Sequence, residues 1–307
     1  MNLLITGGCG HIGSYLVENL SKIRKIKKTF VIDNLHSTQI NSLFNSQKKN
    51  NLKFYLKDLT KKNSLKQFRK IDYVIHLASM TNAAGSFKKK NEMYQNNLQC
   101  MKNIINFCIK NKSKLIHISS TSVYGKQTDI VDENCEKKFL KPQSPYADIK
   151  LIEENMLKKV NNKIKYVTFR FGTISGVSKG MRFHTAVNKF CFDASIGQPI
   201  TVYKTALNQY RPYLSVHDAY KVFKFTIEKN FFKNEIYNAL SENCTVNQII
   251  NKIKNYKKGI KIKFVTSQIM NQLSYHVDKR KLNNEGLFLK NKIKNDIKDT
   301  LKILKNI

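Results

Sequence analysis

The start of this chain constrains the fold most, because it joins a short apolar strand to a glycine-spaced loop and to a second strand that ends in an acid. The loop, in ITGGCGHIGSYL, carries Gly7, Gly10 and Gly13, and the second strand, in FVIDN, ends at Asp33. A G-x-x-G-x-x-G spacing alone is a weak signal. Placed after a strand, at the start of a helix and about 20 residues before an acid, it is typical of a βαβ unit that binds a dinucleotide.

Each part of this unit has a physical role in holding a dinucleotide. The glycines let the backbone approach the pyrophosphate, whose charge is stabilised by the helix N-terminus. Asp33 would accept hydrogen bonds from the adenosine ribose hydroxyls and would repel a 2′-phosphate, so NAD is favoured over NADP. The competing interpretation is a glycine-rich turn that only packs a helix on a sheet, and the context of the loop favours binding.

Further residues at the ends of predicted strands are expected to line the same dinucleotide. Asp58, in YLKDL, could reach the adenine, although a local helix cap two residues before Thr60 explains it nearly as well. His11 is expected to contact the cofactor only by packing. The predicted cofactor-binding set is Gly7, Gly10, His11, Ile12, Gly13, Asp33, Asn34, Asp58, Leu59, Leu77, Ala78 and Ser79, together with Tyr146 and Lys150.

A tyrosine four residues before a lysine, in SPYADIK, supplies a candidate acid/base pair. Tyr146 and Lys150 share one face of a predicted helix. Free tyrosine titrates near pH ~10, and the Lys150 ammonium and a cationic nicotinamide ring would lower the pKa of Tyr146. Ser120, in the serine cluster ISSTSVYG, would hydrogen-bond the substrate oxygen. Y-x-x-x-K alone is common, but behind a dinucleotide loop it indicates NAD-dependent chemistry on a secondary alcohol or ketone.

Short apolar runs alternate with longer amphipathic stretches, which predicts a parallel sheet covered by helices on both faces. The expected strands are Leu3–Thr6, Thr29–Asp33, Leu52–Leu56, Tyr73–Leu77, Lys114–Ser119 and Lys165–Phe171, and the expected helices include Ile12–Ile23, Asn91–Lys110 and Tyr146–Lys159. After about residue 172 the expected elements are a helix over Thr185–Ile196, strands over Pro199–Tyr203 and Glu235–Leu240, and a lysine-rich helix near Asn295–Lys305.

Composition places the chain among globular proteins of a reducing compartment. The 307 residues are 41% hydrophobic, enough for one large domain or two unequal ones. No apolar run approaches the length of a membrane span, and the first strand leaves no room for a signal peptide. The six cysteines show no C-x-x-C or zinc spacing, so we expect free thiols, a cytoplasmic location and no metal site. His76 and His117, in predicted buried strands, are expected to be packed core groups.

The formal charge of +34 is the most extreme property of the sequence, and it carries little functional information. Only six of the 55 basic residues are arginine, and the lysines are spread over nearly every predicted element, as an AT-rich genome would produce. Nucleic-acid readers concentrate basic residues on one face and interleave aromatics or arginine. We therefore expect no specific nucleic-acid partner, although the charge would help to attract a phosphorylated substrate.

Six segments of the chain resemble the extended short-chain dehydrogenase/reductase family, and within it the NAD-dependent nucleotide-sugar epimerases and dehydratases. These segments are GGCGHIGS, FVIDNL, VIHLAS, YQNNLQCMKN, ISSTSVYG and PQSPYADIK. The resemblance is close over residues 1 to about 176 and looser from there to the end, through RPYLSVHDA.

This resemblance implies an α/β fold: a Rossmann-type, doubly wound parallel sheet with a smaller, interwoven C-terminal α/β lobe for the substrate. The implied NAD-binding domain covers residues 1–172 and is completed by a segment near 205–240. The implied substrate lobe covers 173–204 and 241–307. It also implies a homodimer formed through the helices over 91–110 and 146–159.

Residue roles follow from the same resemblance. Tyr146 matches the family's base, Lys150 its partner and Ser120 its serine or threonine, while Asn97 matches a helix asparagine that supports a water or backbone link. The substrate, a nucleoside-diphosphate sugar, would meet the side chains of Ser120, Thr121, Thr173, Arg182 and Arg211. Arg182 could equally form a surface ion pair.

The chain also departs from the family pattern. Thr121 and Ser122 stand where related 4,6-dehydratases carry an Asp-Glu pair, and Ser122 stands where decarboxylating members carry a glutamate. Both reactions would therefore lack their acid. The usual asparagine of R-Y-F-N-x-x-G is Thr173 here, and QIMNQLSYHVD replaces a later arginine clamp.

We interpret the sequence as an NAD-dependent nucleotide-sugar epimerase that acts at C4 through a transient 4-keto intermediate, in polysaccharide precursor synthesis. A sugar dehydrogenase or ketoreductase of the same family would use the same four catalytic residues, Ser120, Tyr146, Lys150 and Asn97. A non-catalytic dinucleotide-binding protein is a less favoured alternative, because Tyr146 and Lys150 are both present.

Overall fold

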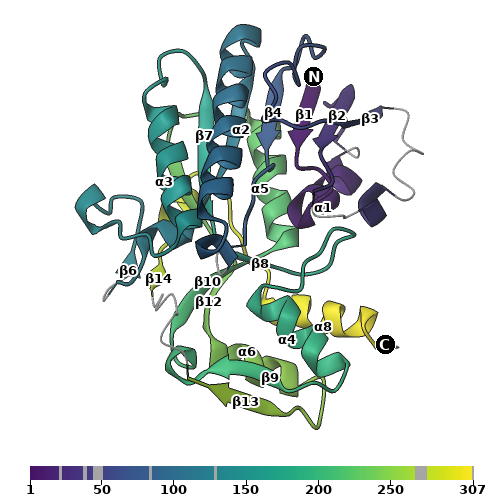
Figure 1. Cartoon of the computed structure of the whole chain (residues 1–307), viewed down its shortest axis with the longest axis vertical. Helices are drawn as coiled ribbons and strands as arrows, with labels where there is room; N and C mark the ends of the chain where they lie inside the picture. Colours follow the sequence, from purple (N-terminus) through teal and green to yellow (C-terminus); the bar gives the residue numbers. More distant parts are fainter. Residues whose placement is uncertain are drawn as a thin grey trace.

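A parallel sheet of seven strands organises the chain, in the order β11-β7-β5-β4-β1-β2-β3 (Figure 1). The computed structural model describes residues 1–20, 23–36, 40–43, 51–82, 85–127, 130–266 and 275–305. The strands are β1 (Asn2–Thr6), β2 (Lys28–Asp33), β3 (Leu52–Leu56), β4 (Tyr73–His76), β5 (Lys114–Ser120), β7 (Tyr166–Phe171) and β11 (Ile236–Ala239). The six strands expected before residue 172 all form, with ends that differ by at most one residue.

Alternation along the strands explains why helices cover both faces of the sheet. In β1, Leu3 and Ile5 point to one face and pack with α1 (His11–Leu20) and α5 (Val216–Lys229). Leu4 points to the other face and packs with α2 (Lys90–Asn111) and α3 (Pro145–Lys158). The fold is therefore the doubly wound, Rossmann-type sheet that the sequence predicts.

Local sequence fixes where α3 begins, and this helix carries the candidate base. Ser144 caps the helix, because its Oγ accepts a hydrogen bond from the backbone N–H of Ala147 at 3.2 Å. Pro145 occupies the first turn, where its missing N–H costs nothing. The helix therefore begins one residue before its predicted start and places Tyr146 in its first turn.

A smaller lobe lies beyond the carboxyl edge of the sheet, at the lower end of Figure 1. Its sheets are β12-β10-β8 and β13-β9, and a further short pair is β14-β6. The strands are β6 (Ile130–Val131), β8 (Thr173–Ser175), β9 (Ile200–Tyr203), β10 (Tyr210–Ser215), β12 (Glu242–Thr245), β13 (Ile262–Val265) and β14 (His276–Val277). The helices of this lobe are α4 (Ala186–Ser195), α6 (Val246–Lys254) and α8 (Ile293–Ile303), while α7 (Arg280–Asn284) packs against β11. Short 3-10 turns are η1 (Ile40–Leu43), η2 (Gly85–Phe87), η3 (Thr121–Tyr124), η4 (Lys137–Phe139) and η5 (Lys204–Ala206).

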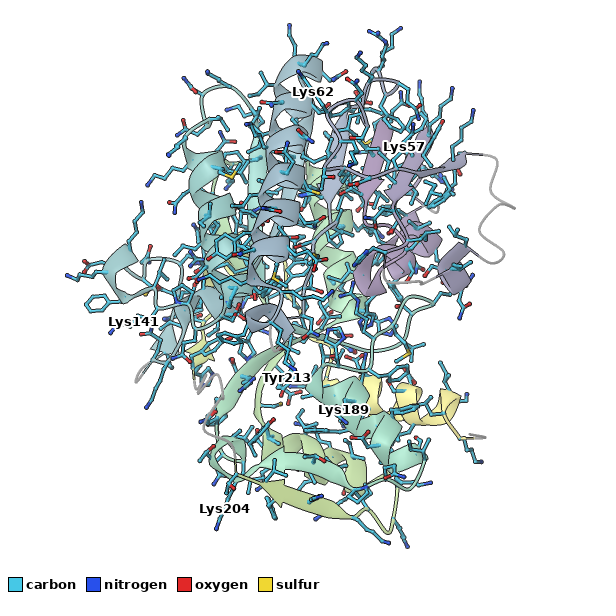
Figure 2. The ribbon with its side chains drawn as sticks, viewed as in Figure 1. Lys57, Lys62, Lys141, Lys189, Lys204 and Tyr213 are labelled. Atoms are coloured by element: carbon cyan, nitrogen blue, oxygen red, sulfur yellow. The ribbon has the colours of Figure 1, made fainter. Side chains whose placement is uncertain are left out.

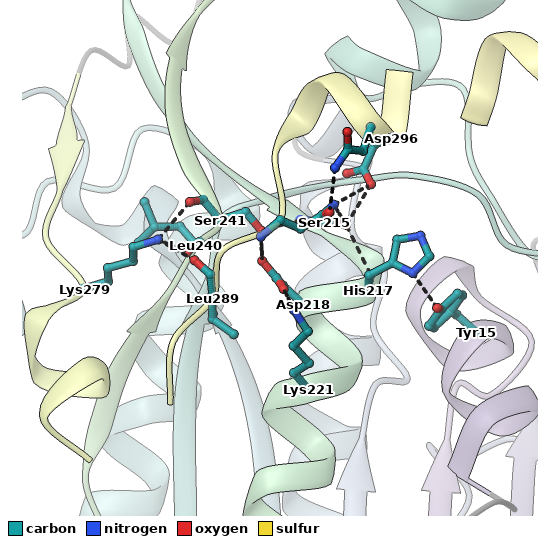
Figure 3. A network of polar contacts seen from close by, with 12 residues as sticks. Tyr15, Ser215, His217, Asp218, Lys221, Leu240, Ser241, Lys279, Leu289 and Asp296 are labelled. Atoms are coloured by element: carbon teal, nitrogen blue, oxygen red, sulfur yellow. Dashed lines mark hydrogen bonds and ion pairs between the residues drawn. The ribbon is translucent and has the colours of Figure 1, made fainter. Parts of the chain in front are cut away.

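The C-terminal segment crosses back to the main sheet before it enters the smaller lobe. Leu282 and Leu289 are buried in the same core as the first face of the sheet. Lys279 Nζ ties this segment to the end of β11, since it donates to the carbonyl oxygens of Leu240 at 3.1 Å and Leu289 at 2.8 Å (Figure 3). The family resemblance implies that all of residues 241–307 belong to the smaller lobe, but Leu282 and Leu289 pack in the core of the main sheet. The domain boundaries themselves stay a prediction.

A buried polar network joins the two parts of the chain where strands end (Figure 3). Asp296 of α8 accepts hydrogen bonds from Ser175 Oγ at 2.6 Å and Ser215 Oγ at 2.8 Å. Asp218, at the start of α5, accepts one from Ser241 Oγ at 2.7 Å. Burial raises the pKa of Asp296 above its usual range. These contacts fix α8 against the strand ends that face the site.

Lysines are spread over the outside of both parts (Figure 2), whereas Lys150 is buried. Figure 2 shows Lys57, Lys62, Lys141, Lys189 and Lys204 at widely separated places, while Tyr213 lies at the junction. None of the helices in the described part of the chain combines the length and apolar character needed to cross a membrane. All six cysteines are free thiols, and five of them are buried.

Phe169→Ala tests the core of the sheet. Phe169 on β7 is fully buried, with ring centroids 6.3 Å from Phe171 and 6.2 Å from Tyr237. Removal of the ring would leave a cavity between Phe171 and Tyr237. We therefore expect the free energy of unfolding to fall by about 3 to 5 kcal/mol in a denaturant titration. Ile130→Ala, at a side chain that is 63% exposed, is the control and should change it by less than about 0.5 kcal/mol. A loss below about 1 kcal/mol for Phe169→Ala would contradict this packing.

Candidate active site

The glycine loop after β1 passes so close to its neighbours that side chains are excluded at two positions. Gly7 has a φ of +69°, and a Cβ there would lie 2.5 Å from the backbone nitrogen of Ala78. A Cβ on Gly13 would lie 2.3 Å from the carbonyl oxygen of Gly7. The loop therefore needs glycine at both positions, and it leads directly into the N-terminus of α1, which begins at His11.

Asp33 lies beside this loop, at the end of β2. Its Oδ2 accepts a hydrogen bond from the backbone N–H of Cys9 at 2.9 Å, and its Oδ1 accepts one from Leu35 at 2.9 Å. Each carboxylate oxygen keeps a further lone pair for a ligand hydroxyl. Asn34 also lies here and accepts a hydrogen bond from the backbone N–H of His36 at 3.1 Å.

Two other predicted cofactor residues make local or structural contacts. Asp58 Oδ1 accepts hydrogen bonds from Thr60 N at 2.9 Å and Thr60 Oγ1 at 2.7 Å, which is the local turn that the sequence allows as an alternative. His11 is buried, and its Nε2 lies 2.8 Å from the carbonyl oxygen of Gly176. Burial lowers the pKa of His11 to about 4, so the ring is neutral at physiological pH.

The loop that follows β4 carries three more of the predicted cofactor-binding residues. Leu77, Ala78 and Ser79 lie at the carboxyl end of β4, as predicted, and are half-buried. Asn97 of α2 is fully buried and holds this loop, because its Oδ1 accepts from the Met80 N–H at 2.8 Å and its Nδ2 donates to the Met80 carbonyl at 3.1 Å. Asn97 thus makes a backbone link of the kind that the family resemblance implies.

The candidate catalytic group comes together at the end of β5. The Ser120 side chain lies close enough to the Tyr146 hydroxyl to favour its ionised form, and Lys150 Nζ lies 5.8 Å from the centroid of the Tyr146 ring. Ser120 Oγ accepts a hydrogen bond from Ser122 Oγ at 2.8 Å. A serine, a tyrosine and a lysine from two separate elements therefore form one cluster, with the hydroxyls of Ser120 and Tyr146 adjacent.

The electrostatics of Tyr146 differ from the sequence expectation. Burial raises the pKa of Tyr146 above its usual value, and this outweighs the opposing charges of Lys150 and Arg182. The expected lowering by Lys150 is weakened because Lys150 Nζ donates a hydrogen bond to Glu153 Oε2 at 2.8 Å. The carboxylate of Glu153 partly offsets the effect of Lys150 on Tyr146. Lys150 lowers the pKa of Tyr146 as expected, but without the nicotinamide ring burial outweighs it, and the lowered pKa with both charges present stays a prediction.

Arg182 reaches into the space between the glycine loop and Tyr146. Its Nη1 donates to the hydroxyl of Thr81, and a Cβ on Gly10 would lie 3.6 Å from its Nη2. Burial lowers the pKa of Arg182, while Tyr146 and Asp33 act in the opposite direction. Its Nε is buried without a hydrogen-bond partner among the described residues. The alternative of a surface ion pair does not describe this side chain.

The remaining predicted substrate residues lie at the junction with the smaller lobe. Thr121 is buried, and its Oγ1 donates to the Phe171 carbonyl at 3.3 Å and lies 3.4 Å from Tyr275 Oη. Arg211 of β10 acts electrostatically on the same Tyr275. Thr173 of β8 is half-buried in the neighbouring strand of that sheet. Thr121 and Arg211 therefore approach the same Tyr275 ring, Thr173 lies in the strand beside Arg211, and their contact with a substrate stays a prediction.

Sequence reasoning missed Glu153 and the role of His117. His117 is buried as expected, but its Nε2 lies 3.0 Å from Glu153 Oε2 rather than against apolar groups alone. The only sequence signal was an acid three residues after Lys150, which places both side chains on one face of a helix. Nothing in the sequence indicates that this face packs against β5.

Two hollows on the surface lie away from this cluster. One, of about 350 Å³, is lined by Lys137, Asn155, Lys158 and Lys159, and the other, of about 300 Å³, lies around Tyr73 and Lys114. Neither contains a residue of the candidate site, so the site is defined by its side-chain chemistry and not by the size of a cavity. Within the described ranges, no group of His, Cys, Asp and Glu side chains could hold a metal ion.

Residues 3–239 match the model of the NAD dependent epimerase/dehydratase family. The chain belongs to this family. It is 30% identical, over 252 residues, to dTDP-D-glucose 4,6-dehydratase of Dictyostelium discoideum, with 77% of this chain and 57% of that protein covered. It is also 27% identical to a putative UDP-glucose 4-epimerase of Methanocaldococcus jannaschii, over 82% of this chain and 81% of that protein. The chain spans about half the length of several curated relatives that it matches, from 44% to 57%.

Solved structures of nucleotide-sugar epimerases have the same fold as this chain. UDP-N-acetylglucosamine 4-epimerase from Methanobrevibacter ruminantium M1, solved with UDP-N-acetylmuramic acid, is 25% identical and has a TM-score of 0.86, with 98% of this chain and 97% of that chain covered. The UDP-glucose 4-epimerase of Thermus thermophilus, solved with NAD, is 22% identical and has a TM-score of 0.82, with 100% and 99% covered. At that identity, the second likeness shows the fold alone.

Gly13→Ala tests the glycine loop. The new Cβ would meet the backbone of Gly7 and Gly8 and force the loop away from α1, so we expect NAD affinity in isothermal titration to fall at least about tenfold. Gly259→Ala is the matched control: its φ is +73° but its surroundings are open, so backbone strain is introduced far from the loop and NAD affinity should not change. Equal NAD affinities of Gly13→Ala and the wild type would contradict the assignment.

Proposed function

We propose that this protein is an NAD-dependent nucleotide-sugar epimerase that acts at C4 through a transient 4-keto intermediate. The observation that carries the proposal is the grouping of Ser120, Tyr146 and Lys150, with Lys150 Nζ 5.8 Å from the centroid of the Tyr146 ring, at the same sheet edge as the glycine loop. Relatives described as UDP-sugar 4-epimerases support the same reaction class.

The residues around the glycine loop fit NAD. The close approaches at Gly7 and Gly13 and the start of α1 at His11 form the cradle that a pyrophosphate requires. The remaining lone pairs of Asp33 fit ribose hydroxyls and disfavour a 2′-phosphate. When bound, NAD would supply a hydride acceptor that returns the same hydride to the sugar.

The protein side chains would handle the proton and the orientation of the sugar. Ser120 would hold the C4 oxygen by a hydrogen bond while Tyr146 accepts its proton, and Tyr146 would return that proton after the keto sugar has turned. Lys150 would stabilise the phenolate form of Tyr146. Because the proton and the hydride both return to the sugar, no net oxidation results and the cofactor need not leave.

An epimerase fits the site better than a dehydratase, although dehydratases occur among the relatives. Elimination of water needs an acid and a base beside the serine, and this chain has Thr121 and Ser122 there. Thr121 Oγ1 is already engaged with the Phe171 carbonyl, and Ser122 Oγ donates to Ser120. Neither hydroxyl can replace a carboxylic acid at neutral pH.

The substrate is proposed to be a nucleoside-diphosphate sugar, with Arg182 and Arg211 as candidate phosphate ligands. We also propose a cytoplasmic homodimer, involved in polysaccharide precursor synthesis, that uses the outer side of α2 and α3. The support for this interface is the packing of the two helices and the partly exposed apolar side chains Leu98, Leu151 and Ile152.

A panel of UDP-, GDP-, dTDP- and CDP-sugars tests the proposed reaction. We expect one sugar to give a chromatographically new product of unchanged mass, with no accumulation of NADH absorbance. Tyr146→Phe should lower the turnover number at least about a hundredfold, because the proton then has no acceptor. Tyr256→Phe, at a side chain that is 44% exposed, is the control and should leave turnover unchanged.

Two outcomes would contradict this function. A product lighter by two hydrogen atoms, formed with stoichiometric NADH, would make the protein a dehydrogenase. No conversion of any sugar, with NAD still bound, would favour a non-catalytic dinucleotide-binding protein.

A further inference from the structure

Glu153 lies directly behind the candidate base and lysine, in a place that is closed to solvent. Its Oε2 accepts hydrogen bonds from Lys150 Nζ at 2.8 Å and from His117 Nε2 at 3.0 Å. The exposed fractions of the Lys150, Glu153 and His117 side chains are 6%, 1% and 0%. An ionised carboxylate in such a place is stable only when it is paired, and both partners are present.

The histidine that holds Glu153 is itself fixed by the sheet. Parallel pairing places Thr6, His76, His117 and Thr168 in one row across β1, β4, β5 and β7. His117 Nδ1 lies 3.2 Å from Thr168 Oγ1. Because an ionised carboxylate only accepts hydrogen bonds, His117 Nε2 carries a proton and donates it to Glu153 Oε2. The ring cannot turn without breaking both bonds, so the position of Glu153 is set by the register of the strands.

We propose that Glu153 is a positioning residue, which fixes Lys150 behind Tyr146 and whose negative charge sets the pH at which the Tyr146–Lys150 pair releases its proton. This inference rests on the proposed function, in which Tyr146 is the base. Glu153 does not touch the reacting atoms; it acts through Lys150.

The charges around the pair determine the sign of this effect. Burial opposes the ionised form of Glu153, but Lys150 and His117 outweigh it and lower its pKa to about 2. Burial likewise opposes the charged form of Lys150, but Glu153 and Tyr146 raise the pKa of Lys150 above its usual value. Glu153 therefore stays anionic and favours retention of the proton on the pair.

The other charged and titratable groups that face the pair do not replace Glu153. Glu154 is engaged with Arg170, at 2.9 and 2.7 Å, and with Ser119. Burial lowers the pKa of His76 to about 3, so this ring is neutral, and burial raises the pKa of Cys100 to about 12, so this thiol is protonated. Arg182 acts on Tyr146 from the loop side with a positive charge. Glu153 is therefore the anion that bears directly on Lys150.

Glu153→Gln keeps the shape of the side chain and removes its charge. We expect the Tyr146–Lys150 pair to release its first proton at a pH lower by about one unit or more, because a nearby negative charge no longer opposes the release. The measurement is the tyrosinate absorbance of the NAD-free protein as a function of pH. Difference spectra isolate Tyr146 from the other tyrosines. For the wild type, the spectrum of Tyr146→Phe is subtracted. For Glu153→Gln, the spectrum of the double variant Glu153→Gln/Tyr146→Phe is subtracted.

The pH profile of kcat/KM provides a second readout. Because activity requires the unprotonated base, its acidic limb should move to lower pH in Glu153→Gln by the same amount. If Glu153 had a purely structural role, Glu153→Gln would lower kcat/KM by the same factor at every pH. The acidic limb of the profile would then stay at the same pH. The absorbance titration needs no substrate, so it remains readable if the proposed epimerase function fails.

Two variants control this experiment. Asp148→Asn removes a carboxylate from the same helix, but Asp148 is half-buried and accepts a hydrogen bond from Tyr94 at 3.4 Å. Burial and Asp148 raise the pKa of Tyr94, so the spectrum of Asp148→Asn/Tyr146→Phe is subtracted from that of Asp148→Asn. Neither the titration of Tyr146 nor the acidic limb should then change. Glu153→Asp keeps the charge and withdraws it from Lys150, so the shift should have the same sign and be smaller. If Glu153→Gln does not fold, Glu153→Asp decides the question alone. Coincident titrations of the wild type and of the folded Glu153 variants would overturn the proposal.

Discussion

The packing of α3 on β5 is the contact on which the candidate site depends. Two hydrogen-bonded pairs cross this interface, Glu153 with His117 at 3.0 Å and Glu154 with Ser119 at 2.6 Å, and Tyr146 lies near Ser120 at the end of the strand. Successive side chains of a strand alternate in direction, so the partners at 117 and 119 share one face of β5 and the serine at 120 lies at its end. Any shift of α3 along β5 would break these bonds together, which makes the geometry of the base a property of the whole interface.

Charged side chains in this protein are of two kinds: lysines exposed on the surface, and buried cations that are paired with carboxylates. The surplus of positive charge is carried by lysines on the surface of both lobes, at positions unrelated to the site (Figure 2). Inside, Lys150 is paired with Glu153, and Arg170 with Glu154. Arg182 differs, because its guanidinium contacts Thr81 and leaves Nε unbonded among the described residues. The surplus charge would attract an anionic substrate from a distance, and under the proposed function Arg182 is a candidate ligand for its phosphates.

Under the proposed function, few residues would decide the type of reaction. The glycine loop, Asp33, Ser120, Tyr146 and Lys150 would serve the oxidation of a sugar alcohol in general. Elimination of water would need an acid beside the serine, and the hydroxyls of Thr121 and Ser122 are engaged there. The chain departs from the pattern of the family that it resembles at Thr173 and around Arg211, so these positions are candidates for setting the identity of the sugar.

The sequence by itself determined the sheet, the helices around it and the core of the site, because these rest on local periodicity, on glycine spacing and on residues one helical turn apart. Only the tertiary structure decided that Glu153 and His117 meet behind Lys150, that Arg182 reaches between the glycine loop and the base, and that the pKa of Tyr146 is raised in the isolated chain. It also showed that Asp58 closes a local turn and that Leu282 and Leu289 return to the main core. The physical reason is the same in each case: these features depend on strand register, on which helix face is buried and on the loss of water from a charge, and none of them is encoded in the spacing of neighbouring residues.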